Sequence, residues 1–153
     1  MPIVKLGMAI ASVVLLFALI ALLALRKRRP DPIVARARFP AHRPALEAAF
    51  FEAASQSGKP RGLRWVRCEF GDGLEMARDK TTGELIGLLP MTIAFEAIPG
   101  SDMEGLPAVG NLRYASAVFT FNNGKWTTVG RAVFNMNPAE ALRHFANVYG
   151  RID

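Results

Sequence analysis

Residues 112–135 read LRYASAVFTFNNGKWTTVGRAVFN, and this stretch decides the fold. Its first half alternates and places small and aromatic residues on one face, namely Ala115, Ala117, Phe119 and Phe121. Asn123-Gly124 is a dipeptide typical of tight hairpin turns. The second half returns with apolar residues on a shared face across Gly130. Two such runs around a turn predict antiparallel strands over 112–122 and 125–135.

Strand patterns also fill the chain before this hairpin. Residues 63–70 alternate between apolar and polar side chains, which is typical of a strand. A second short strand is expected at 74–78, after the turn Gly71-Asp72-Gly73. The run 84–98 is long and apolar, with Pro90 in its middle. Because proline cannot donate to a strand ladder, Pro90 predicts a bulge, an edge or a break into two strands.

Helical patterns lie on either side of the strands. A helix is predicted to begin near Pro44 and to end at Gly58 and Pro60. Near the carboxyl end, Asn137 can cap a second helix. Its apolar stripe is Leu142, Phe145, Ala146 and Tyr149, and Gly150 is expected to end it. Pro138 and Glu140 complete the start signal, as in a capping box. The expected fold class is α+β, a small roll of one helix, four to six antiparallel strands and a short C-terminal helix.

Residues 6–25 read LGMAIASVVLLFALIALLAL and contain no charge. A helix of this length spans about 30 Å, the thickness of a bilayer core. The run is longer than the apolar part of a cleavable signal peptide and lacks an Ala-x-Ala cleavage motif, so an uncleaved transmembrane helix is favoured over that alternative. Residues 1–25 are therefore expected to be a membrane anchor.

Basic residues follow the apolar run directly, as Arg26, Lys27, Arg28 and Arg29. Positively charged residues beside a membrane span stay in the cytoplasm. They therefore predict a single-pass protein of the inner membrane, with its N-terminus outside and its C-terminal domain in the cytoplasm. The four basic side chains are expected at the lipid surface. Residues 26–43 are basic, hold three prolines and predict an extended linker. Residues 44–153 are then the folded domain.

The charge is unevenly divided. The net charge is +6, but residues 1–43 carry eight basic groups against one acidic group, and residues 44–153 carry eleven against twelve. The folded part is thus close to neutral, which argues against nucleic-acid binding. The expected partners are the bilayer and a protein at the membrane; the oligomeric state is left open.

Four segments carry a resemblance: 62–66, 95–98, 103–104 and 126–136. They resemble small uncharacterised bacterial proteins of the planctomycete kind. The order of elements, a helix followed by a meander of long strands, resembles the cystatin-like or NTF2-like α/β roll. Neither resemblance implies a catalytic residue, and rolls of this kind include enzymes, ligand carriers and scaffolds.

The sequence predicts no catalytic, metal or cofactor site. Cys68 is the single cysteine and is expected on an inward strand face, where it is an inert thiol. The two histidines, His42 and His144, are too few for a histidine-rich metal centre. The acidic pair Asp102 and Glu104 lacks the ligand number of a calcium loop.

Two functions remain as hypotheses. The leading one is a membrane-anchored interaction module or accessory subunit without catalytic chemistry, with partner-binding candidates in the long loop 99–111: Asp102, Met103, Glu104 and Leu106. The alternative is a pocket between helix and sheet that binds or converts a small hydrophobic ligand. Its candidate polar groups are Glu96, Arg113, Tyr114 and Arg131.

Overall fold

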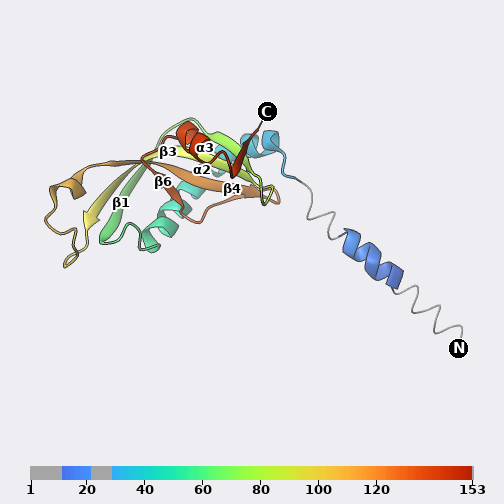
Figure 1. Cartoon of the computed structure of the whole chain (residues 1–153), viewed down its shortest axis with the longest axis horizontal. Helices are drawn as coiled ribbons and strands as arrows, with labels where there is room; N and C mark the ends of the chain where they lie inside the picture. The colour runs from blue at the N-terminus through green and yellow to red at the C-terminus, as the bar shows by residue number, and fades with distance from the viewer. Residues whose placement is uncertain (1–11, 22–28, 153) are drawn as a thin grey trace, which may run out of the picture.

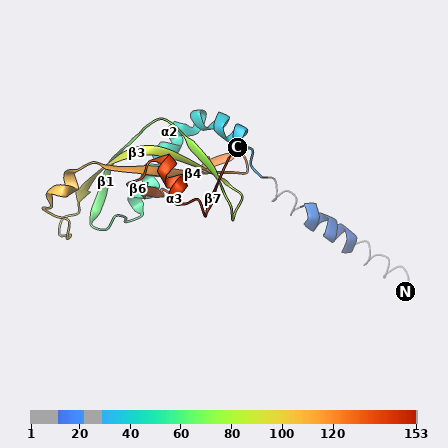
Figure 2. The same ribbon diagram turned by 45° about the horizontal axis from the view of Figure 1, so that its top comes forward.

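The computed structural model describes residues 12–21 and 29–152. A seven-stranded antiparallel sheet carries a long helix on one face and a short helix on the other (Figures 1 and 2). The order across the sheet is β5-β4-β3-β2-β7, with β1 beside β3 and β6 beside β4. The predicted helix-plus-antiparallel-sheet α+β class is confirmed. The strands are β1 (Leu63–Phe70), β2 (Glu75–Asp79), β3 (Leu85–Ala97), β4 (Arg113–Asn122), β5 (Lys125–Thr127), β6 (Ala132–Phe134) and β7 (Tyr149–Arg151).

The predicted hairpin forms between β4 and β5. Asn123 and Gly124 both have positive φ, 49° and 76°, as a tight primed turn requires. The returning strand is interrupted, however, and continues only as β6 after Gly130. Both short strands pair with β4, so the interruption leaves the sheet connected.

Pro90 lies within β3, which continues through it opposite Ser116 of β4. The break falls instead on the neighbouring edge, where β1 ends at Phe70 and β2 begins at Glu75. Gly71 N–H still donates to the Pro90 carbonyl at 2.8 Å, but proline has no N–H to return to the Gly71 carbonyl. Arg43 Nη2 donates to that carbonyl at 2.9 Å instead.

Helix α2 (Pro32–Gln56) covers the face of the sheet that carries the larger core cluster. Its N-cap is Asp31, whose side chain accepts from Ile33 N–H at 2.8 Å. The predicted extended linker over 26–43 is therefore wrong from Pro32 onward, and the helix does not begin near Pro44. Packing supplies the reason, because Ala35 and Phe39 of the early turns are buried, and the Trp126 indole donates to the Ala35 carbonyl at 2.9 Å.

Two prolines, Pro40 and Pro44, lie inside this helix. Each removes one helical hydrogen bond, and a proline in a helix interior costs about 3 kcal/mol. Both are exposed, so the carbonyl groups left without a helical partner lie on the side that water can reach. Burial of the opposite stripe offsets this cost, so the local propensity does not decide the boundary.

Helix α3 (Pro138–His144) packs on the other face of the sheet. The predicted cap is confirmed: Asn137 accepts from Glu140 N–H, and Glu140 accepts from Asn137 N–H, both at 2.9 Å. The predicted end at Gly150 is wrong, because the helix stops at His144. Tyr149 and Gly150 belong to β7, which pairs with β2.

The predicted membrane span is the main correction. Among residues 12–21 and 29–152, no helix combines the length and apolar character needed to cross a bilayer. The described helix over 12–21 rises only about 15 Å, against about 30 Å for a bilayer core. This contradicts the transmembrane helix and, with it, the single-pass inner-membrane placement. Residues 6–11 and 22–25 of the expected span lie outside the described residues, as do Arg26, Lys27 and Arg28; Arg29 is exposed.

Candidate functional site

Aromatic and aliphatic side chains fill the space between α2 and the sheet. Phe50 of α2 is fully buried and meets Phe119 of β4 with ring centroids 5.9 Å apart. Phe39 lies in an earlier turn of the same helix, and the centroid of its ring is 5.7 Å from that of Phe119. Phe121 is buried beside Trp126, and Phe134 packs against the same cluster. The expected position of an interior ligand pocket is thus occupied by side chains.

The four pocket candidates lie outside this interior and do not converge. Glu96 is exposed, and its carboxylate pairs with the Arg64 guanidinium of β1 at 2.5 Å. Arg113 donates to the Ala108 carbonyl at 3.1 Å, so it braces the loop before β4. Tyr114 is 44% exposed.

Arg131 lies on the α3 side of the sheet. Its guanidinium donates to the Tyr149 hydroxyl, and it also lies 5.8 Å from the centroid of that ring. Arg131 therefore joins the β5–β6 connection to β7 across the face that α3 covers. This contact is a tertiary link, and it takes the arginine away from the other three candidates.

The partner-loop candidates lie together at the end of the sheet, between β3 and β4. Glu104 accepts from Gly100 N–H at 2.8 Å, and Ser101 donates its hydroxyl to the Gly62 carbonyl at 3.0 Å. Met103 is half-buried beside Gly62, whereas Asp102 and Leu106 are exposed. A short 3-10 turn, η1 (Pro107–Gly110), completes the loop. The loop thus has a defined shape that presents some side chains and uses others as supports.

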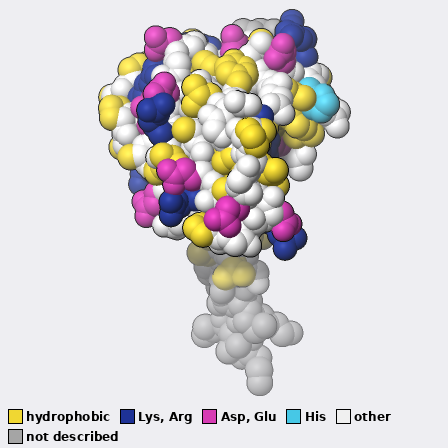
Figure 3. Space-filling view, turned by 90° about the vertical axis from the view of Figure 1, so that its left-hand side faces the viewer, with side chains coloured by type: hydrophobic (Ala, Val, Ile, Leu, Met, Phe, Trp, Pro, Cys, Tyr) yellow, Lys and Arg dark blue, Asp and Glu magenta, His cyan; other side chains and the backbone are white. Residues whose placement is uncertain are grey.

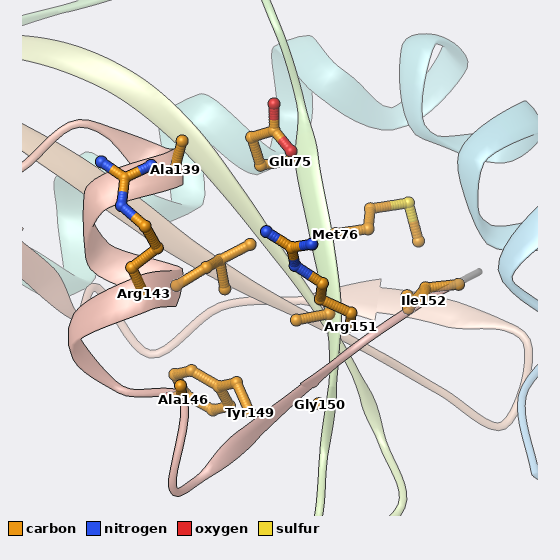
Figure 4. A pocket seen from close by; sticks show the side chains of 11 residues that line it. Glu75, Met76, Ala139, Arg143, Ala146, Tyr149, Gly150, Arg151 and Ile152 are labelled. Atoms are coloured by element: carbon orange, nitrogen blue, oxygen red, sulfur yellow. The ribbon is translucent and has the colours of Figure 1, made fainter.

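A hollow of about 420 Å³ lies between α3, β2 and β7 (Figure 4). Arg143 reaches it from α3 and Arg151 from β7, with Glu75 of β2 above them. Its walls are mostly apolar, including Met76 and Leu142. The sequence did not predict this hollow, because Tyr149 was assigned to the apolar stripe of the last helix and not to a strand. Arg143, shortly before β7, and Arg151, the last residue of that strand, are the only signal in the sequence that could have indicated it.

The described residues hold no group of three or more His, Cys, Asp and Glu side chains that could bind a metal ion. His42 Nδ1 lies 2.8 Å from the Arg38 carbonyl, one helical turn away. His144 stacks edge-on against Phe145 at 4.8 Å. Both histidines are thus engaged in local contacts on their own helices.

Cys68 is half-buried on the core side of β1, as the alternation predicted. Burial raises the pKa of its thiol to about 12, from a usual value of 9.0. A thiol with so high a pKa forms little thiolate near neutral pH, so it is a poor nucleophile.

This raised pKa makes stability depend on pH. The buried thiol favours folding fully below the pKa of the unfolded chain, near 9, and that contribution is lost as the pH rises toward 12. We therefore expect the stability advantage of the native chain over Cys68→Ala to shrink between about pH 8 and about pH 10.5, as measured by urea unfolding. Alkylation by iodoacetamide at about pH 8 should be slow in the folded chain and fast in urea. An advantage that is constant across this range, or rapid alkylation of the folded chain, would contradict the burial of the thiol.

The resemblance to planctomycete proteins and to a cystatin-like or NTF2-like roll stays a prediction. Known proteins offer no further guide: no protein-family model, no curated protein and no solved structure matches this chain.

Proposed function

We propose that this chain is a protein-interaction module that binds its partner through the loop between β3 and β4, without catalytic chemistry of its own. The observation that carries the proposal is a set of large apolar side chains left exposed on an internally braced loop. Ile98, Leu106 and Leu112 are 46%, 49% and 56% exposed. Figure 3 faces this end of the molecule and shows hydrophobic side chains interspersed with charged ones.

The bracing of the loop favours binding. Its backbone is tied to the preceding segment, since Ile98 N–H donates to the Gly62 carbonyl at 2.9 Å. Arg113 holds the other side through the Ala108 carbonyl. A loop that is ordered before binding loses less conformational entropy when a partner docks. Burial of the exposed half of each of these aliphatic side chains would then contribute about 1 kcal/mol.

The charges on the loop indicate the chemistry of the partner. Asp102 is exposed, and no ion pair joins it to another residue within 12–21 or 29–152. Glu104 is also exposed, although it accepts the Gly100 N–H. The fitting partner is a protein surface with an apolar patch beside a basic side chain. Complementary charge of this kind sets orientation and association rate more than affinity.

The alternative of a small-ligand pocket inside the roll has less support. Its expected position between α2 and the sheet holds Phe50, Phe119 and Phe121, and its candidate polar groups lie apart. Cavities that bind ligands need open space with converging polar groups. The interaction module is therefore the function that we propose.

Crosslinking in the cells that make the protein tests this proposal. A photo-reactive residue is placed at Ala108, which is exposed in η1 beside Leu106. We expect one discrete crosslinked protein, with a yield that falls at least about tenfold when Leu106→Asp is added. Asp102→Lys should lower the yield by a smaller factor.

The matched control is Val129→Asp, which places the same charge at an apolar residue that is 83% exposed in the β5–β6 connection. This control should leave the yield unchanged. If no crosslinked protein forms, or if its yield is indifferent to Leu106→Asp, the proposed loop interface is wrong.

A further inference from the structure

Strand β1 has one unpaired edge. It is hydrogen-bonded to β3 along its length, and no other described strand pairs with it. At eight residues it is longer than β5, β6 and β7, the other strands at the margins of the sheet. An unpaired edge is a row of free backbone donors and acceptors that another strand can satisfy.

The hydrogen-bonding pattern between β1 and β3 shows which backbone groups of β1 point away from β3, toward the free edge. Gly71 donates to the carbonyl of Pro90, so Gly71 directs its backbone groups toward β3. In an antiparallel ladder this direction alternates along the strand. Glu69 and Arg67, which lie opposite Thr92 and Ala94, therefore also bond to β3. Cys68 and Phe70 direct their N–H and C=O groups to the free edge.

Two features limit the part of this edge that a partner strand can use. The register shifts between Trp65 and Arg67, which marks a bulge in β1. At the other end, Arg43 reaches the carbonyls of Phe70 and Gly71 and pairs with Asp72 at 3.0 Å. The section between these two limits is 66–70, with Cys68 at its centre and with the Phe70 carbonyl already 3.5 Å from Arg43 Nη2.

We propose that a second copy of this chain binds here, so that the two β1 strands pair antiparallel about a two-fold axis at Cys68. In this register Arg67 of one copy lies opposite Glu69 of the other, and the same pair recurs on the far side of the axis. Both side chains are exposed, 60% and 64%, and within one chain Arg67 Nε lies 3.1 Å from Glu69 Oε1; neither forms an ion pair with any other described residue. The strand is therefore complementary in charge to its own antiparallel copy.

The apolar side of the strand matches as well. A hollow of about 400 Å³ runs between the free edge of β1 and α2, and its walls include Val66, Phe70, Phe51 and Ala48. In the proposed register Phe70 of the second copy lies opposite the exposed Val66. The two-fold axis also brings both α2 helices to the same side of the joint sheet. Pairing thus covers apolar surface on one face and pairs charges on the other.

Charge exchange in the full chain tests the interface by sedimentation equilibrium. Glu69→Arg should weaken the dimer about tenfold, because it turns two attractive cross-strand pairs into repulsive ones. The double variant Arg67→Glu/Glu69→Arg should restore the dimer to within about threefold of the native chain. Glu75→Arg is the matched control, an exposed glutamate on β2 whose reversal should leave the dimer unchanged.

A disulfide experiment tests the register itself. Cys68 is replaced by serine, and Arg67→Cys and Glu69→Cys are introduced into separate chains. Opposed residues that do not exchange backbone hydrogen bonds have Cα atoms about 4.5 Å apart, within the range of a disulfide. A mixture of the two variants should therefore form a disulfide dimer under oxidation. Neither variant alone should do so, because the cysteines of two identical chains would lie diagonally across the strand pair, farther apart than directly opposed residues.

Three results would overturn the proposal. One is a chain that stays monomeric at every concentration tested. Another is a dimer that is indifferent to the charges at 67 and 69, as expected for association through the exposed apolar helix 12–21. The third is equal disulfide formation in mixed and unmixed chains.

Discussion

Replacing Gly130 by alanine is expected to lower the free energy of unfolding by about 2–5 kcal/mol. Gly130 has a φ of +71°, and a Cβ atom there would lie 2.3 Å from the backbone nitrogen of Ala54 and 2.7 Å from the carbonyl carbon of Ala53. The atoms it meets belong to the backbone of α2, so no side-chain rotation relieves the contact. Either β6 must move from the helix, or α2 must shift.

The control for this substitution is Gly83→Ala. Gly83 has a similar φ of +77°, but nothing lies within 4 Å of the position of its Cβ atom. It should therefore cost about 1–2 kcal/mol, the price of the left-handed backbone alone. Urea unfolding of both variants separates the two effects. Equal losses would mean that the close approach of Gly130 to α2 contributes nothing.

Replacing Phe50 by alanine should lower the free energy of unfolding by about 3–5 kcal/mol. Phe50 is fully buried, and its ring lies 5.7–6.3 Å from those of Phe70, Phe119 and Trp65. The substitution removes this apolar area and leaves a cavity that the surrounding strands can only partly close.

Phe51→Ala is the matched control, because it removes the same side chain at the next position of the same helix. Phe51 is only half-buried and packs at the margin of the core. Its loss should cost clearly less than that of Phe50 in the same urea titration. Similar losses at both positions would show that α2 does not present Phe50 as the centre of the core.

Strong local signals explain which elements could be predicted. The Asn123-Gly124 turn and the capping box of α3 each satisfy backbone requirements within four or five residues. Alternation over 63–70 also placed Cys68 on the core side. Such features depend on neighbours in the chain, so a single sequence is enough to find them.

The misplaced boundaries depend on contacts between distant segments. Helix α2 continues back to Pro32 because its early turns reach Trp126, a residue far along the chain. Strand β7 forms because Tyr149 meets the edge of β2. Local propensity is a weak guide wherever burial of this kind can outweigh it.

The candidate site divides in the same way. The sequence predicted a long loop over 99–111 between two strands, and the structure has this loop between β3 and β4; that it binds a partner stays a proposal. The support of that loop by Gly62 and the scattering of Glu96, Arg113 and Arg131 did not follow, because they depend on how the strands align.

The linear order of residues was sufficient for the α+β class, the main hairpin and the capped last helix, because backbone sterics and hydrogen bonding within a few residues govern them. It was misleading for the apolar run 6–25, where the described part holds no helix suited to span a bilayer. Tertiary packing alone decided the start of α2, the filled interior and the free edge of β1. These features arise from burial between segments distant in the chain, whose combined free energy exceeds local preferences.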